Sequence, residues 1–360
     1  MNYWEVSLMD CQIKITDNKA VWKIQAALAL IFLLNPFLGV LSTLFFVFVS
    51  KEKSMAFYLV IILTLFMWCL QSTRSFHLGE PSDWAGNYYY NFHNAAITDT
   101  LTYLFFTTKE YAWQAFNLIG YYLFDGDFLS YANFIVALTY MFTFAAIYKF
   151  WNYIQADPRF LVASLCLFAF VTEVNGICNN LLRQQFAMSM MLYAIIERCT
   201  NGRILYPLLV ISFFTHTMTG FFIPFLFIRL GKKASFRFYI YIVLGFGLLY
   251  ILFTNLSIFS SSSFYAFQRL ATASNAYALK DIIQPSAVYP FLAVTVILYV
   301  KAFFFDSERR KCELYINNLF LILISMCLLM TSMPLMQTRY FIIRFFFMPL
   351  VVPYFFTAKG

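Results

Sequence analysis

The chain has 360 residues, of which 62% are hydrophobic and 12% are charged, and its mean hydropathy is +0.71. This composition excludes a soluble globular domain and predicts an integral membrane protein. The formal net charge of +8 does not predict nucleic-acid binding, because the basic residues are scattered between apolar runs and are not gathered on a polar domain.

Apolar runs predict helices that cross or enter the membrane, because about 17 to 25 apolar residues span a hydrocarbon core of about 30 Å. We expect such helices near residues 24–49, 55–70, 131–150, 160–171, 177–196, 238–253, 288–305, 314–330 and 340–356. With shorter segments, the runs predict an all-α polytopic membrane protein with about 10 to 11 transmembrane helices or half-helices. Residues 1–360 then form a single integral membrane domain.

The N-terminal segment, residues 1–23, carries three lysines, Lys14, Lys19 and Lys23. A single first crossing would place them outside, whereas lysines favour the cytoplasmic side. A break at "LLNPFLG" would turn the first run into a hairpin and remove the conflict. The sequence leaves the side of the N-terminus open. The first run is too long for a cleavable signal peptide and lacks a small-residue cleavage site.

The remaining basic loops fall on one side of the membrane if residues 204–228 form a short hairpin and not a full crossing. The tip of this hairpin is "FTHTMTG", which puts His216 opposite the basic loops. Two long segments, 71–130 and 255–286, then lie on the outer side. The apolar spacing within residues 71–130 predicts amphipathic helices on the membrane surface.

The sequence predicts neither a metal site nor a nucleotide-binding site. The seven cysteines form no CxxC pair, which argues against a disulfide framework or a metal site. His77, Glu80, Asp83 and His93 match no metal-ligand spacing, and no phosphate-binding glycine loop occurs. We therefore expect no metal and no cofactor.

Basic side chains on the predicted outer side point to an anionic ligand. Arg183 begins an apolar run, and an arginine inside a membrane segment costs at least ~2.5 to 3.5 kcal/mol, so it persists where it faces a cavity or a partner. Arg74, His216, Arg269 and Arg339 come from other outer segments, with few acids nearby. Guanidinium groups match phosphate oxygens bidentately. The alternative is that the arginines reach the outer headgroups, which applies more to Arg74 and Arg344 than to Arg183 with its neighbour Gln184.

Aromatic residues surround Asp83 in the stretch "PSDWAGNYYYNF". The rings of Trp84 and Tyr88 resemble a sugar-binding surface, although Trp and Tyr also gather at membrane interfaces as belts. Asp83 itself either contacts a sugar substrate or caps a helix.

Four stretches carry a resemblance to a known family: "PSDWAGNYYYNF", "TKEYAWQAFNLIGYYLFDGDFLSY", "NNLLRQQFAMSMM" and "FFTHTMTGFFIP". Their order resembles the EpsG-type and related Wzy-type polysaccharide polymerases of bacterial envelopes. The resemblance covers residues 55–230, and the later part of the chain matches only through an arginine in each outer loop.

This resemblance implies an enzyme that joins oligosaccharide repeat units carried on polyprenyl pyrophosphate, at the outer face of the bacterial cytoplasmic (inner) membrane. It implies a reaction without nucleotide sugar or metal, with a chain-length regulator and a flippase as partners. The product, O-antigen, capsule or exopolysaccharide, stays open. Arg183, Arg269 and Arg339 would bind the pyrophosphate leaving group. We favour His216 as base or leaving-group contact and Asp83 as contact to the acceptor sugar or alternative base. The alternative for His216 is a hydrogen-bonded histidine in a helix turn. Gln184, Arg74, Tyr88 and Trp84 would contact substrate.

Two other functions remain as alternatives. A lipid-linked oligosaccharide flippase would have a central cavity and two similar halves, and no internal repeat is visible. A membrane O-acyltransferase would place its catalytic histidine inside the membrane, which His216 alone does not exclude.

Overall fold

The structure is a computed structural model that describes residues 18–50, 52–75, 77–78, 83–105, 110–171, 181–228, 230, 244–245, 248, 293, 311–329 and 334–352. These residues form helices and turns and no strand, so the all-α prediction is confirmed. The chain divides into two compact units, Met1–Phe221 and Phe222–Gly360. The predicted segments 238–253, 255–286 and 288–305 lie outside the described residues, apart from 244–245, 248 and 293.

The first unit begins with a helical hairpin, α1 (Asn18–Leu34) and α2 (Pro36–Ser50). Pro36 has no N–H to continue α1, and the Asn35 side chain accepts a hydrogen bond from the Leu38 amide at 3.1 Å. A Cβ on Gly39 would lie 2.4 Å from the Cα of Phe32, so the two helices touch backbone to backbone. The prediction of one continuous run over residues 24–49 is therefore wrong, and the hairpin alternative holds.

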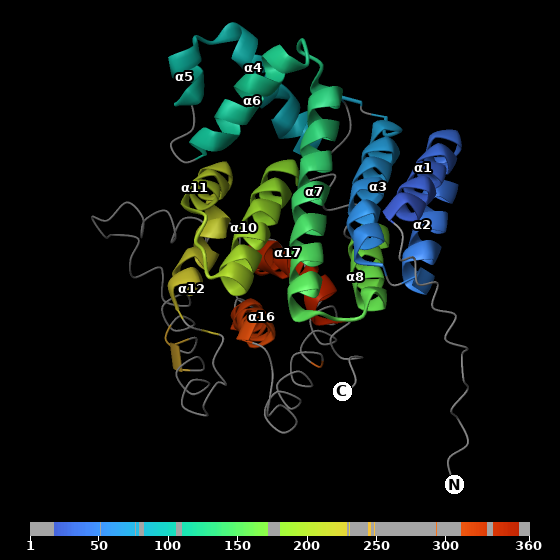
Figure 1. Ribbon diagram of the computed structural model, residues 1–360. Coiled ribbons are helices and arrows are strands. Elements are labelled where there is room, and N and C mark those ends of the chain that lie inside the picture. Colours follow the sequence, from blue (N-terminus) through green and yellow to red (C-terminus); the bar gives the residue numbers. More distant parts are fainter. Residues whose placement is uncertain are drawn as a thin grey trace. The chain divides into compact units, whose positions relative to one another are not determined.

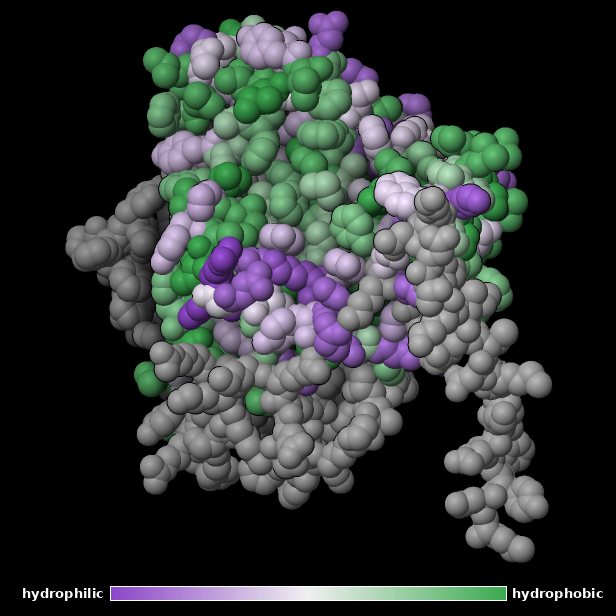
Figure 2. All heavy atoms as spheres, viewed as in Figure 1, coloured by the Kyte–Doolittle hydropathy of each residue, from purple (hydrophilic) through white to green (hydrophobic). Residues whose placement is uncertain are grey.

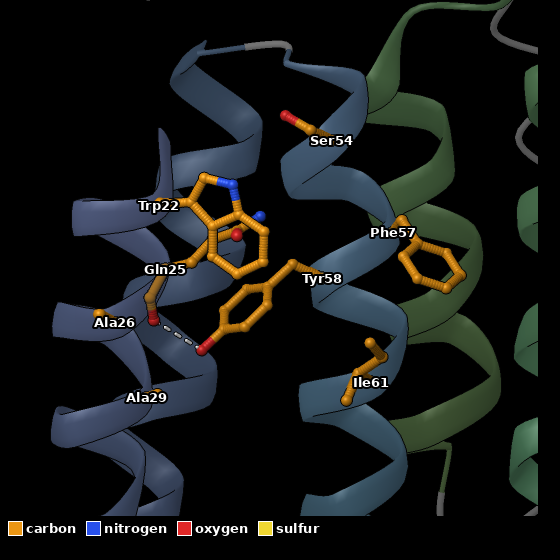
Figure 3. Close-up of a pocket in the computed structure, with 8 residues that line it drawn as sticks. All are labelled: Trp22, Gln25, Ala26, Ala29, Ser54, Phe57, Tyr58 and Ile61. Atoms are coloured by element: carbon orange, nitrogen blue, oxygen red, sulfur yellow. Dashed lines mark hydrogen bonds between the residues drawn. The ribbon is translucent and has the colours of Figure 1, made fainter. Parts of the chain in front are cut away.

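Helix α3 (Lys53–Ser72) runs in the same direction as α1. The hydroxyl of Tyr58 donates to the Gln25 carbonyl at 2.9 Å, and in Figure 3 α1 descends from Trp22 to Ala29 in the same direction as α3 descends from Ser54 to Ile61. Between them is an open, mostly apolar cavity of about 520 Å³. Because α1 and α3 are parallel, both helices begin at the same end of the first unit.

The centre of the first unit is the pair α7 (Phe128–Ile154) and α10 (Leu182–Asn201), which run side by side (Figure 1). Lys149 of α7 forms an ion pair with Glu197 of α10 near their C-terminal ends, so the two helices are parallel. Helix α3 packs antiparallel on α7, because Phe57 from its first turns lies 5.6 Å from Tyr148 between ring centroids. Helix α8 (Pro158–Phe170) follows α7, with Asp157 capping the Arg159 amide at 2.9 Å.

Helix α11 (Tyr206–Thr215) follows α10 and packs against it. The α-helix stops at His216, whose backbone is extended, and a 3-10 helix, η2 (Thr217–Phe222), follows. Gly220 lies so close to Phe213 that a Cβ would be 2.8 Å from its ring. The chain therefore folds back on α11 directly after His216.

Basic and polar residues gather at the end of the first unit where α7 and α10 finish. Figure 2 shows this hydrophilic area below a broad hydrophobic band that covers the helices. The residues there include Lys149, Asn152, Arg159, Arg198 and Arg203. We call this the basic end. The starts of α1 and α3 share it.

The opposite end is covered by short helices (Figure 1). They are the π-helix η1 (Trp84–Tyr88), α4 (Tyr89–Ile97), α5 (Thr100–Leu104) and α6 (Tyr111–Leu123). Gly120 packs directly on the Tyr131 ring, where a Cβ would lie 2.3 Å away. Asp127 then caps α7 through the Leu129 amide at 3.0 Å. The tight turn between α6 and α7 uses Gly126 at φ +75°, a conformation that favours glycine.

Large apolar side chains stay exposed on these short helices, among them Ile97, Leu101, Ile119 and Leu123. Within the described residues, two helices are long and apolar enough to cross a membrane, Ser54–Ser72 and Phe128–Ile154. Helix α10 differs from these because nearly all of its length is buried inside the unit. The fold is that of an all-α polytopic membrane protein.

The second unit contains α12 (Ile223–Phe227), α16 (Lys311–Leu329) and α17 (Pro334–Val351). Hydrogen bonds from α16 to the segment around α12 join residues about 90 positions apart: Tyr315 Oη donates to the Phe225 carbonyl at 2.6 Å, and Asn318 Nδ2 to that of Leu230 at 2.7 Å. Gln337 Nε2 of α17 donates to the Cys327 carbonyl of α16 at 2.9 Å.

Candidate functional site

Arg183 lies in the first turn of α10, at the end of the first unit opposite the basic end. Its guanidinium Nη1 donates to Oε2 of Glu110, which stands just before α6. The two side chains are 22% and 15% exposed, so the ion pair is shielded from solvent without being sealed. The sequence interpretation expected few acids near the arginines, and for Arg183 this is wrong.

The Arg183 guanidinium keeps unused hydrogen-bonding capacity. Its Nε is buried and has no hydrogen-bond partner. The start of α10 adds partial positive charge, because the first amides of a long helix point outward along its dipole. The result is a cationic position whose single acidic partner, Glu110, contacts only one of the guanidinium nitrogens in the described structure.

Tyr88 joins this pair from η1. Burial raises the pKa of its hydroxyl from 10.0 to about 12. The Arg183 charge and a hydrogen bond from the Arg183 backbone lower this pKa, whereas the charges of Asp83 and Glu110 raise it. Tyr88 is therefore a neutral hydrogen-bonding group at physiological pH, within electrostatic reach of Arg183, Glu110 and Asp83.

Asp83 stands at the start of η1 and is exposed. Its side chain makes no capping hydrogen bond there, so the helix-capping alternative for Asp83 finds no support. The Asp83 carboxylate is exposed and lies within electrostatic reach of Tyr88.

Arg74 and Trp84 form a pair beside Asp83. The Arg74 guanidinium carbon lies 4.3 Å from the Trp84 ring centroid, which is cation–π distance. Trp84 itself is fully buried and packs edge-on against Phe128 at 5.7 Å between centroids. The burial of Trp84 and Tyr88 differs from the open sugar-binding surface that the sequence suggested. Both rings are buried packing residues next to the site.

His216 is buried at the end of α11. Its Nδ1 accepts a hydrogen bond from the Met218 amide at 3.3 Å, and its carbonyl accepts from Thr219 Oγ1 at 2.9 Å. A neutral ring whose Nδ1 accepts carries its proton on Nε2. In this arrangement the outer nitrogen of His216 is a donor.

The other predicted residues are placed as follows. Gln184 is buried within α10. Arg339 is exposed on α17 of the second unit. Arg344, also on α17, is buried, and its guanidinium carbon lies 4.3 Å from the Phe345 centroid. Arg269 lies outside the described residues. The structure therefore assembles Arg183, Tyr88 and Asp83 in one cluster and adds Glu110 to it.

A buried polar network joins Gln114 and Asn117 of α6 to Tyr131 of α7. Gln114 Oε1 accepts from Asn117 Nδ2 at 3.5 Å, and Tyr131 Oη donates to Asn117 Oδ1 at 2.8 Å. Gln114 Nε2 is buried with no hydrogen-bond partner. Buried polar side chains therefore lie on α6 between its start, next to Glu110, and the junction with α7.

Sequence reasoning missed Glu110. No short-range pattern joins it to Arg183, because 73 residues separate them. The available signal was its position: Glu110 lies in the predicted outer segment, on the same side as Arg183 by the distribution of basic loops. Pairing each outer arginine with the acids of that side would have included it.

No group of three or more His, Cys, Asp or Glu side chains that could hold a metal ion occurs among the residues the structure describes. Comparisons with curated proteins and with solved structures gave no match. Residues 57–359, by contrast, match the sequence model of the EpsG family. That match covers most of the chain, and the protein belongs to the EpsG family.

Proposed function

We propose that this protein is a polysaccharide polymerase that joins oligosaccharide repeat units carried on polyprenyl pyrophosphate, at the outer face of the bacterial cytoplasmic membrane. Membership of the EpsG family suggests a polysaccharide polymerase-type function. The family and the apolar helices together support a membrane location. We also propose the lipid carrier, the roles of the residues and the orientation.

The observation that carries the proposal is the Arg183 guanidinium, held at the start of α10 with an unpartnered Nε. When the anomeric carbon of the growing chain is attacked, its bond to the pyrophosphate breaks and negative charge develops on the leaving group. A fixed guanidinium and the positive end of a helix stabilise that charge in the transition state. Arg269 and Arg339 are proposed to share this role.

The attacking group is a sugar hydroxyl of the next carrier-linked unit, and it needs a base. We assign this role to Asp83, because its carboxylate is exposed and is not used as a helix cap. His216 is assigned to the leaving group or to a sugar oxygen, because its Nδ1 already accepts from Met218 and Nε2 is then a donor. Tyr88, Trp84 and Gln184 are buried and are assigned to holding these groups in place. Arg74 is assigned to substrate contact.

The distribution of charge supports the proposed orientation. The basic end collects lysines and arginines that favour the cytoplasm. Arg183, Glu110 and Asp83 lie at the other end of the same unit, which we assign to the exterior. Donor and acceptor both remain anchored in the membrane by their polyprenyl chains.

The experiment is elongation of a purified substrate. The purified protein is incubated with its carrier-linked repeat unit, without nucleotide and with excess chelator, and products are separated by size. A ladder of longer chains is expected. Single units that stay intact, in membranes where the lipid instead changes sides, would overturn the polymerase and establish a flippase.

A further inference from the structure

We propose that Glu110 is an internal counter-ion that pyrophosphate displaces from Arg183, and that this exchange sets how tightly the enzyme holds its donor and its spent carrier. The inference rests on the proposed function, since it assigns a positioning residue to the same site. It concerns anion binding, which can be measured apart from catalysis.

The geometry of the guanidinium separates the two partners. Glu110 contacts Nη1, which lies on the same side of the guanidinium as the arginine's own Cδ. Nε and Nη2 form the opposite edge, and this edge is the one that binds two oxygens of a phosphate side by side. In the structure Nε on this edge is buried and has no hydrogen-bond partner. Glu110 therefore leaves the Nε–Nη2 edge of the guanidinium unused.

The pair with Glu110 leaves the Nε of Arg183 without a hydrogen bond. A buried charged donor without a partner is energetically unfavourable, and a hydrogen bond to an incoming phosphate oxygen would remove that cost. Phosphate and carboxylate both carry negative charge, so a pyrophosphate on the same guanidinium weakens the pair with Glu110. Binding of one anion therefore opposes binding of the other.

The position of Glu110 differs from that of Arg183. It occupies the position before α6, and its side chain makes no capping hydrogen bond to that helix. It comes from the segment that covers the site, whereas Arg183 is fixed in a buried helix. When the spent carrier leaves, the carboxylate returns to Arg183 and keeps the empty site neutral.

The test measures binding of inorganic pyrophosphate to the purified full-length protein by calorimetry or thermal shift. Glu110→Gln removes the competing charge at almost constant size, and roughly tenfold tighter binding is expected, because a charge-assisted hydrogen bond contributes about one factor of ten or more. Glu110→Ala serves as a second variant that removes the same charge. In an Arg183→Ala background the Glu110→Gln effect should vanish.

Asp99→Asn is the matched control, since Asp99 is an exposed acid of the same outer segment that caps α5. Its removal changes the net charge equally and should leave pyrophosphate binding at the wild-type level. Unchanged or weaker binding by both Glu110 variants overturns the exchange, and so does an equal gain in Asp99→Asn. A wild-type protein that fails to elongate substrate while Glu110→Gln binds pyrophosphate more tightly would refute the polymerase and leave the exchange standing.

Discussion

Ser212 of α11 donates its hydroxyl to the carbonyl of Ala187 in α10 at 2.8 Å, and both residues are buried. This bond sets the register of the two helices. His216 lies four residues after Ser212, and Arg183 lies four residues before Ala187. Because α11 runs back along α10, equal steps from the bond bring His216 to the level of Arg183. A histidine and an arginine from different helices thus belong to one end of the unit.

Arg183→Ala should abolish polymer formation while the protein still accumulates in the membrane. Loss of one fixed donor to a developing anion costs about 10²- to 10³-fold in kcat. Arg183→Lys should recover little, because an ammonium cannot form the bidentate contact. The measurement is the product ladder. Arg198→Ala, on the same helix at the basic end, is the control and should elongate normally. Full activity of Arg183→Ala would refute the role in leaving-group binding.

Asp83→Asn should lower kcat by about 10²- to 10⁴-fold, the usual contribution of a general base. His216→Gln should lower it less, because an amide still donates a hydrogen bond where the Nε2 proton stood. Single-turnover rates with saturating substrate separate the two. The reverse ranking would make His216 the base and Asp83 an acceptor contact.

The alkaline stability of the protein should report on Tyr88 and Tyr103. Burial raises the pKa of each hydroxyl to about 12. The folded state therefore favours the neutral tyrosines. This stabilisation is complete below pH 10 and is lost as the pH rises from about 10 to 12.

Tyr88→Phe should reduce the slope of unfolding free energy against pH in this window by about 1.4 kcal/mol per pH unit, which corresponds to one proton. Chemical denaturation in detergent at a series of pH values gives the slope. Tyr90→Phe, at an exposed position of α4, is the control. An unchanged slope for Tyr88→Phe would show that its hydroxyl is not shielded as described.

The ion pair at the basic end should be structural. Glu197→Gln leaves the Lys149 ammonium against α10 without its carboxylate, and we expect the free energy of unfolding to fall by about 1.5 to 3 kcal/mol. The Asn201 amide, which donates to Glu197 Oε1 at 2.7 Å, still finds an acceptor in glutamine. Replacing both partners, Lys149→Met with Glu197→Leu, should recover much of the loss. A double variant as unstable as the single one would contradict this account.

Gly39→Leu should prevent the close approach of α1 and α2. A Cβ there meets the Phe32 backbone, and overpacking of this kind costs about 1 to 3 kcal/mol, more where backbone must move. Thermal unfolding and yield from membranes measure the effect. Gly86→Ala is the comparison, because a Cβ at Gly86 has no atom within 4 Å. Equal tolerance at both positions would refute the tight crossing.

Hydrophobic length predicted much of the helical framework. Helices α3, α7 and α8 begin and end within a few residues of the expected runs, because their apolar stretches are bounded by charges or by Pro158. Ala187, Met190 and Ala194 follow Arg183 at helical spacing on α10, and all three are buried. Length alone could not divide residues 24–49, since a proline is tolerated inside many membrane helices.

The candidate site was harder to predict from the sequence than the helices. Arg183 was visible as a charge in an apolar run, and its neighbours Asp83 and Tyr88 were visible as an aromatic and acidic stretch. Their proximity depends on how α4 and α6 fold over α7, which involves a glycine contact on Tyr131 and not a sequence period. Glu110 entered the site for the same reason. Tertiary packing decided which charges meet.

The hairpin of α1 and α2 also has a consequence for the surrounding lipid. Its helices have 17 and 15 residues, which gives lengths of about 26 and 22 Å at 1.5 Å per residue. Both fall short of the hydrocarbon thickness of about 30 Å. Such hydrophobic mismatch is relieved when the bilayer thins around the short element. The membrane beside Asn35 and Pro36 is therefore expected to be locally thinner than elsewhere around the protein.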